Sequence, residues 1–185
     1  IMDFIECKAK EEAKAHCLIE KGGYEANFNG EAYSSIMFQN ANLSVRVTDD
    51  FMNAVVEDGE WKTRWVTDSR KHGPTYQAQE IMRKMSEMAW KCGDPGVQYD
   101  TTINRWHTCP NSGRINASNP CSEYMFLDDT ACNLASLNLV KFMEADGSFN
   151  IEAFRHATRI WTMVLEISVL MASYPSADIA RLSYE

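Results

Sequence analysis

The sequence lacks any long apolar run, any excess of basic residues and any closely paired cysteines. No apolar stretch approaches the roughly 18 residues that a membrane span requires, and charged residues begin at the third position, which is not typical of a secretory signal. Lys and Arg number 18 against 26 Asp and Glu, which gives a net charge of −8. Nucleic-acid and anionic-membrane surfaces need clustered cations, so we expect neither partner.

Cysteine is scarce and irregularly spaced. The six cysteines lie at positions 7, 17, 92, 109, 121 and 132, and none forms a Cys-x-x-Cys pair. Such spacings do not predict a disulfide framework for a chain of 185 residues. We therefore expect a reducing, cytoplasmic environment, in which any disulfide is transient and catalytic.

Helical and strand patterns alternate along the chain, which predicts an α/β class with a mainly parallel sheet. Helices are expected at residues 1–21, 49–58, 74–92 and 151–173, and strands at 42–47, 61–66 and 96–104. Glycines follow the first three helices, Thr48 or Asp49 caps the second, and Asn150 caps the last. The chain starts at Ile1 and ends without a polar taper, so we expect residues 1–185 to be an internal fragment of a longer protein.

The segment SNPCSEYMFLDDTACNLASLNL, residues 118–139, concentrates the candidate chemistry. Asn119 and Glu123 each lie two positions from Cys121, and Cys132 follows eleven positions after Cys121. If the segment is extended, alternate residues share one face, and Asn119, Cys121 and Glu123 form a ladder with steps of roughly 6–7 Å. A small substrate with adjacent hydroxyls would then meet a carboxylate that moves a proton, a carboxamide that binds a hydroxyl and a thiol that reacts at carbon.

Three other interpretations explain these residues less completely. The residues considered for a zinc site are Cys92, His107, Cys109, Cys121 and Cys132. They are scattered, whereas structural zinc ligands are usually closely paired, so we expect no metal. A Cys121 nucleophile with His107 as its base is compatible with the sequence but gives the other polar residues no role. Two half-buried structural cysteines would leave the Asn-x-Cys-x-Glu arrangement unexplained.

The stretch NPCSE followed by ACNLASLNL resembles the active-site finger loop of the large catalytic chain of ribonucleotide reductases. The flanking stretches NANLSVRVTDDFM and GDPGVQYDTTINRWHTCPNSGRINASNPCSEY are most similar to the adenosylcobalamin-dependent, class II branch. The oxygen-dependent class I chains are similar more loosely, around the same cysteine. The resemblance covers essentially the whole chain, and its motif includes Asn119, Cys121, Glu123 and Cys132.

The resemblance implies a fold and a separate role for each residue of the motif. The fold is a ten-stranded α/β barrel, of which this chain is a part, with a finger loop at about residues 117–139 threaded through its centre. By resemblance, Cys121 becomes a thiyl radical that takes hydrogen from C3′ of the ribose, Glu123 is the general base for the 3′-hydroxyl, and Asn119 holds the substrate hydroxyls. Cys132 resembles one half of the redox disulfide that supplies electrons, with its partner outside this chain.

The implied function is reduction of ribonucleotides to 2′-deoxyribonucleotides for DNA synthesis, with adenosylcobalamin as cofactor. The implied partners are a ribonucleotide substrate, deoxynucleotide or ATP effectors of the full-length protein, and a thioredoxin-like reductant. The resemblance assigns no cobalamin-binding residue in this chain. Two alternatives stay open: a class I catalytic chain, which uses a separate radical-generating subunit, and a non-catalytic truncated fragment, since the isolated fragment is expected to be inactive.

Overall fold

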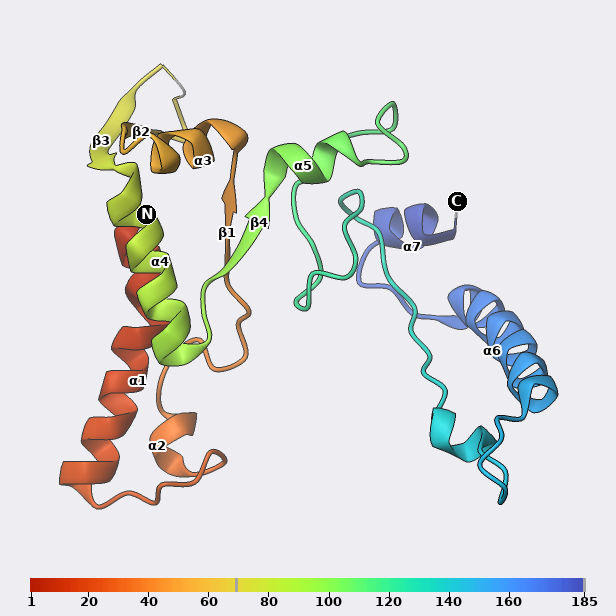
Figure 1. The fold of residues 1–185 in the computed structure, drawn as a ribbon. Coiled ribbons are helices and arrows are strands. Elements are labelled where there is room, and N and C mark those ends of the chain that lie inside the picture. Colours follow the sequence, from red (N-terminus) through yellow and green to blue (C-terminus); the bar gives the residue numbers. More distant parts are fainter. Residues whose placement is uncertain (69, 185) are drawn as a thin grey trace. The chain divides into compact units, whose positions relative to one another are not determined.

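The computed structural model describes residues 1–68 and 70–184, and the chain divides into two compact units, Ile1–Asn111 and Ser112–Glu185. Figure 1 shows helices and short strands in the first unit, and helices joined by long irregular segments in the second. The mixed α/β content agrees with the prediction from the sequence. Within the described residues the strands form no closed barrel.

The first unit carries all the strands of the described chain. Its elements are α1 (Met2–Gly22), α2 (Glu31–Ser34), β1 (Ser44–Val47), α3 (Asp49–Val56), β2 (Glu60–Arg64), β3 (His72–Gln77), α4 (Ala78–Cys92), β4 (Gly96–Tyr99) and α5 (Asp100–Arg105). β1 pairs in parallel with β4, and β2 pairs antiparallel with β3. The expected mainly parallel sheet is therefore wrong for the described strands, which form one parallel and one antiparallel pair.

The helix ends of the first unit follow local sequence signals. Gly23, after α1, and Gly93, after α4, adopt left-handed conformations with φ of 72° and 81°, which a residue without a Cβ adopts at little cost. The side chain of Thr48 accepts a hydrogen bond from the N–H of Phe51 and caps α3. These ends are confirmed as predicted.

Two boundaries predicted from local patterns are wrong, and non-local contacts account for both. The third helix begins only at Ala78, because residues 72–77 form β3 and pair with β2. The strand predicted at 96–104 is limited to its first part, β4, and continues as α5. The carboxylate of Asp100, which begins α5, accepts a hydrogen bond of 2.9 Å from Arg46 of β1. This contact fixes the start of α5 beside the parallel pair.

Buried apolar side chains from α1, β1, α3 and α4 form the core of the first unit. Its buried members are Ile5, Val47, Phe51, Ala78, Ile81, Met85 and Met88. α1 and α4 pack side by side (Figure 1), and an ion pair of 3.1 Å between Lys84 and Glu6 joins them. Removal of this apolar surface from water is the main force that holds the helices and strands together.

The second unit has regular helices but little buried core. Its elements are the 3-10 helix η1 (Leu139–Phe142), α6 (Ile151–Met171) and α7 (Ala177–Tyr184). Asn150 caps α6 as predicted, by accepting a hydrogen bond of 2.8 Å from the N–H of Ala153. The rings of Phe142, Phe149 and Phe154 contact one another with centroids 5.4 to 6.1 Å apart and join η1 to the start of α6.

α6 exposes much of its apolar surface. Its exposed large apolar side chains are Ile151, Ile160, Trp161, Met163, Val164, Ile167, Leu170 and Met171. Among described residues 112–184, Ile115 is the one buried residue. Trp161 and Val164, in the middle of this helix, are 46% and 42% exposed. A helix with this much exposed apolar surface needs a partner surface. None of the helices in the described ranges is both long and apolar enough to cross a membrane.

Candidate active site

The NPCSE segment lies on a loop that is closed at its base. The side-chain amide of Asn116 donates a hydrogen bond of 2.9 Å to the carboxylate of Asp128. Ile115, which precedes Asn116, is only 2% exposed. These contacts hold the two ends of residues 116–128 together, so the residues between them are presented on a tethered loop.

At the tip of this loop, Asn119 closes a tight turn around Cys121. The N–H of Ser122 donates to the carbonyl of Asn119 at 3.0 Å, and the N–H of Asn119 donates to the carbonyl of Tyr124 at 3.3 Å. The Oδ1 atom of Asn119 also accepts a hydrogen bond of 2.9 Å from the N–H of Tyr124. Pro120 occupies the second position of the turn, which its fixed φ suits. Asn119 therefore fixes the stem of the turn through both its backbone and its side chain.

The extended ladder predicted for Asn119, Cys121 and Glu123 is wrong. Ser122 has a φ of 63°, in the left-handed region, and the chain reverses between Asn119 and Tyr124. The side chains of Cys121 and Glu123 are exposed, while Asn119 is half-buried. The turn leaves the Cys121 thiol and the Glu123 carboxylate exposed to solvent. The carboxamide oxygen of Asn119 makes its hydrogen bond inside the loop.

Tyr124 links the loop tip to the returning arm. The Tyr124 hydroxyl donates a hydrogen bond of 3.0 Å to Oγ1 of Thr130. The Thr130 hydroxyl in turn donates to the carbonyl of Leu127 at 2.6 Å. The rings of Tyr124 and Phe126 lie 6.0 Å apart between centroids. Sequence reasoning missed Tyr124 and Thr130; the available signal was an aromatic residue with a polar tip directly after the motif, since such a hydroxyl usually finds a partner.

Cys132 lies beyond this loop, in an irregular segment that is bonded to α6. Its thiol is free and exposed, as is the thiol of Cys121. Asn133, the next residue, donates from Nδ2 to the carbonyl of Leu165 at 2.9 Å and to Oγ of Ser168 at 2.5 Å. The two cysteines therefore have separate supports, the closed turn for Cys121 and α6 for the segment of Cys132.

Within either unit of the described chain, the side chains assemble neither a zinc site nor a pair of Cys121 and His107. In the described part of the chain, no three His, Cys, Asp or Glu side chains gather as a metal ion would require. His107 belongs to the first unit, where its Nδ1 accepts a hydrogen bond of 3.3 Å from the N–H of Cys109. Cys121 belongs to the second unit.

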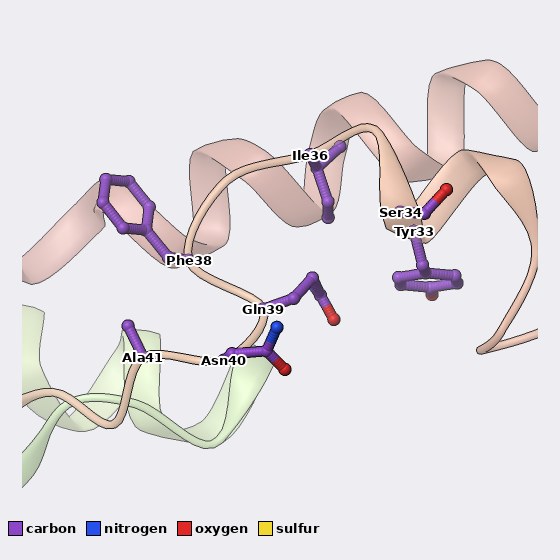
Figure 2. Close-up of a pocket in the computed structure, with 7 residues that line it drawn as sticks. All are labelled: Tyr33, Ser34, Ile36, Phe38, Gln39, Asn40 and Ala41. Carbon is purple, nitrogen blue, oxygen red and sulfur yellow. The ribbon is translucent and has the colours of Figure 1, made fainter.

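The first unit contains a hollow whose lining offers little for catalysis. Apart from the phenol of Tyr33, the lining residues carry no acidic, basic or thiol group. Figure 2 shows the hollow along the end of α2 and the chain that follows, lined by Tyr33, Ser34, Ile36, Phe38, Gln39, Asn40 and Ala41. Glu11 of α1 anchors this chain by accepting a hydrogen bond of 3.0 Å from the N–H of Met37. The ammonium of Lys14 and, to a lesser extent, the Met37 N–H lower the pKa of Glu11. These contacts shape the hollow and supply no reactive group.

Comparison with known proteins identifies one family. The family model described as "Ribonucleotide reductase, barrel domain" matches residues 1–184. A protein of Rhodopirellula baltica named vitamin B12-dependent ribonucleotide reductase is 64% identical, over 100% of this chain and 18% of its own length. A protein of the same name from Streptomyces avermitilis is 49% identical, over 98% of this chain and 19% of its own length.

A more distant relative carries a more specific name. A protein of Thermoplasma acidophilum named vitamin B12-dependent ribonucleoside-diphosphate reductase is 35% identical, over 80% of this chain and 19% of its own length. The chain thus spans somewhat less than a fifth of the length of the curated relatives that it matches.

Proposed function

The chain belongs to the ribonucleotide reductase family, and we propose that it forms the part of the catalytic barrel that carries the radical-bearing finger loop. One observation carries the proposal: an exposed, free Cys121 at the tip of a turn closed by Asn119, within the stretch that the family model matches. The reaction proposed for the full-length protein is reduction of ribonucleotides to 2′-deoxyribonucleotides.

In this proposal Cys121 performs the one-electron step. As a thiyl radical, it takes the hydrogen atom from C3′ of the ribose, which forms an S–H bond and leaves a carbon radical. Glu123, exposed on the same turn, accepts the proton of the 3′-hydroxyl. Asn119 donates to a substrate hydroxyl from its Nδ2 group, since its oxygen is bonded to Tyr124. The 2′-hydroxyl then takes up a proton from one of the two redox thiols and leaves as water.

Cys132 performs the two-electron step with a partner thiol outside this chain. The two thiols lose two electrons and two protons and become a disulfide. The substrate gains these electrons, with hydrogen bonded at C2′ in place of the hydroxyl. Cys121 then returns its hydrogen atom to C3′ and is again a thiyl radical. A thioredoxin-like reductant restores the two thiols for the next turnover.

Adenosylcobalamin is the cofactor that we propose, because the relatives are named vitamin B12-dependent. When bound, it supplies the one-electron chemistry that removes the hydrogen atom of the Cys121 thiol. The described residues fit this need, since Cys121 is free and exposed on a tethered turn. We assign no residue of this chain to hold the cofactor.

The described units are proposed to be portions of a ten-stranded α/β barrel, with residues 117–139 as its finger loop. Two features support this. The parallel pair of β1 and β4 has no further strand beside it in the described chain, and parallel pairs occur almost only inside larger, covered sheets. The exposed apolar surface of α6 also requires a covering layer.

The remaining partners of the full-length protein are proposed on the same basis. A ribonucleotide is the substrate, and deoxynucleotides or ATP act as effectors. We place the reaction in the cytoplasm, because the mechanism requires thiols that are reduced between turnovers.

The test is the activity of the full-length protein that contains this segment, assayed with a ribonucleotide and a dithiol. Deoxynucleotide should form only when adenosylcobalamin is added, and no second subunit should be needed. The same preparation of Cys121→Ala should form none. If activity did not depend on cobalamin and required a diiron partner protein, the protein would instead be a class I reductase. Absence of deoxynucleotide under both conditions would refute the proposed activity.

A further inference from the structure

Asn133 attaches the segment that follows the finger loop to α6. Its Nδ2 group donates to the carbonyl of Leu165 at 2.9 Å and to Oγ of Ser168 at 2.5 Å. The Ser168 hydroxyl in turn donates to the carbonyl of Leu165 at 2.8 Å. A carboxamide –NH₂ has two hydrogens, and both have an acceptor here. The three residues therefore form a closed set of hydrogen bonds between an irregular segment and a helix.

We propose that Asn133 is a positioning residue, which holds Cys132 at α6 in the geometry that its thiol needs to form the redox disulfide. This inference rests on the proposed function, in which Cys132 is one of the two redox thiols. Residues 131–138 form neither helix nor strand, so regular backbone pairing does not fix the exposed thiol. Adjacent Cα atoms lie 3.8 Å apart, and anchoring the side chain of Asn133 therefore restricts where Cys132 can lie.

α6 is a suitable support for this purpose. It runs for 21 residues, its first turn is capped by Asn150, and the rings of Phe142, Phe149 and Phe154 pack at its start. A disulfide requires a narrow range of separations between its two cysteines. A thiol that is held in that range forms the bond with a larger equilibrium constant than one on a freely moving segment. Removal of the Asn133 contacts should therefore lower the equilibrium constant for disulfide formation.

The test uses the full-length protein without cofactor, equilibrated in glutathione redox buffers. The fraction of Cys132 in a disulfide is measured by alkylation and mass spectrometry. Asn133→Ala should lower the equilibrium constant about three- to tenfold, a shift of up to about 30 mV toward a more oxidising potential, since tenfold corresponds to 29.6 mV. Asn133→Asp keeps the side-chain shape but removes both donors, so it should shift the constant in the same direction. Asn138→Ala is the control, because the side-chain bond of Asn138 found among the described residues is the cap that it forms on η1 by accepting from the N–H of Val140.

A milder variant guards against loss of folding. Ser168→Ala removes one of the two acceptors and leaves the Leu165 carbonyl, so it should produce a smaller shift in the same direction. In turnover with cobalamin, Asn133→Ala should release label from C3′ at the wild-type rate while deoxynucleotide formation falls. That split between the two steps is not expected from general loss of structure.

Three results would overturn the inference in distinguishable ways. If Cys132 forms its disulfide in the wild type and both Asn133 variants keep the wild-type constant, Asn133 does not position Cys132, and the proposed function still stands. If Asn133→Asp alone matches the wild type, the hydrogen bonds that Asn133 donates to α6 do not position Cys132, because side-chain shape and not donation would then matter. If wild-type Cys132 forms no disulfide at all, its proposed redox role fails, and the inference fails with it.

Discussion

Asn119 and Tyr124 are joined by two hydrogen bonds that run in opposite directions. Asn119 Oδ1 accepts from the N–H of Tyr124 at 2.9 Å, and the Asn119 N–H donates to the Tyr124 carbonyl at 3.3 Å. The hydrogen bonds found among the described residues leave the Nδ2 group of Asn119 available to meet a substrate. In the proposed mechanism Asn119 then has two separable roles: its oxygen closes the turn that carries Cys121, and its nitrogen binds a substrate hydroxyl.

Substitutions of Asn119 should separate these roles. Asn119→Asp keeps an acceptor for Tyr124 but loses the donor, so we expect the KM for ribonucleotide to rise about tenfold, the value of one hydrogen bond of about 1.4 kcal/mol. Asn119→Ala also opens the turn, so kcat should fall as well because Cys121 is less well placed. Steady-state kinetics of the two full-length variants provide the measurement. Equal kcat values for the two would contradict a structural role for the carboxamide oxygen.

Substitution of Glu123 should affect the chemical step. Glu123→Gln keeps the side-chain size, but a carboxamide does not accept the 3′-hydroxyl proton, so kcat should fall by ~10²–10⁴ while substrate binding is retained. Glu152→Gln is a matched control, since Glu152 is an exposed glutamate of the same unit that pairs with Arg155. Wild-type kcat for Glu123→Gln would remove Glu123 from the mechanism.

Glu11 should make the stability of the first unit pH-dependent. Lys14 and the Met37 N–H hold its pKa below the ordinary value of 4.5. A carboxyl whose pKa is lowered by folding stabilises the folded state above its unfolded pKa, and that contribution is lost as the pH falls through the folded pKa. Glu11→Gln should therefore melt at a lower temperature than the wild type at neutral pH. The difference should shrink below about pH 4.5, and a difference that grew with acid would contradict the role of the ionised carboxylate.

The isolated segment should not behave as a finished domain. Residues 1–185 made alone would expose the apolar side chains of α6 and the edges of β1 and β4. We expect aggregation or a partly molten state, measured by light scattering and near-ultraviolet circular dichroism. Trp161→Glu should reduce the aggregation, because Trp161 is a large exposed ring of that helix. A monomer with a sharp, cooperative melt would show that the segment needs no covering layer.

The sequence was informative where structure depends on nearby residues. Gly23 ends a helix because it adopts a positive φ, and Thr48 and Asn150 begin helices because their side chains accept hydrogen bonds from N–H groups three residues later. All three signals lie within a few positions of the boundary that they mark. The Asn-x-Cys-x-Glu motif around Cys121 was likewise recognised because its residues lie close together in the sequence.

Sequence reasoning failed where distant residues decide the conformation. Residues 72–77 contain Gly and Pro, which disfavour a strand, yet they pair with β2. Asp100 ends a strand-like pattern because it meets Arg46, 54 positions earlier. The ladder predicted at Cys121 assumed an extended chain, whereas Asn119 bonds to Tyr124 and closes a turn. Such contacts are not encoded in local periodicity.

Release of label from ribonucleotide tritiated at C3′ tests the assignment of Cys121 most directly. In the full-length protein, Cys121→Ser should release no label and form no deoxynucleotide, because the O–H bond of serine is much stronger than the S–H bond of cysteine. Cys132→Ser should still release label but yield free base in place of deoxynucleotide, since its two-electron reductant is missing. Release of label by Cys121→Ser at the wild-type rate would contradict the role of Cys121 as the thiyl radical.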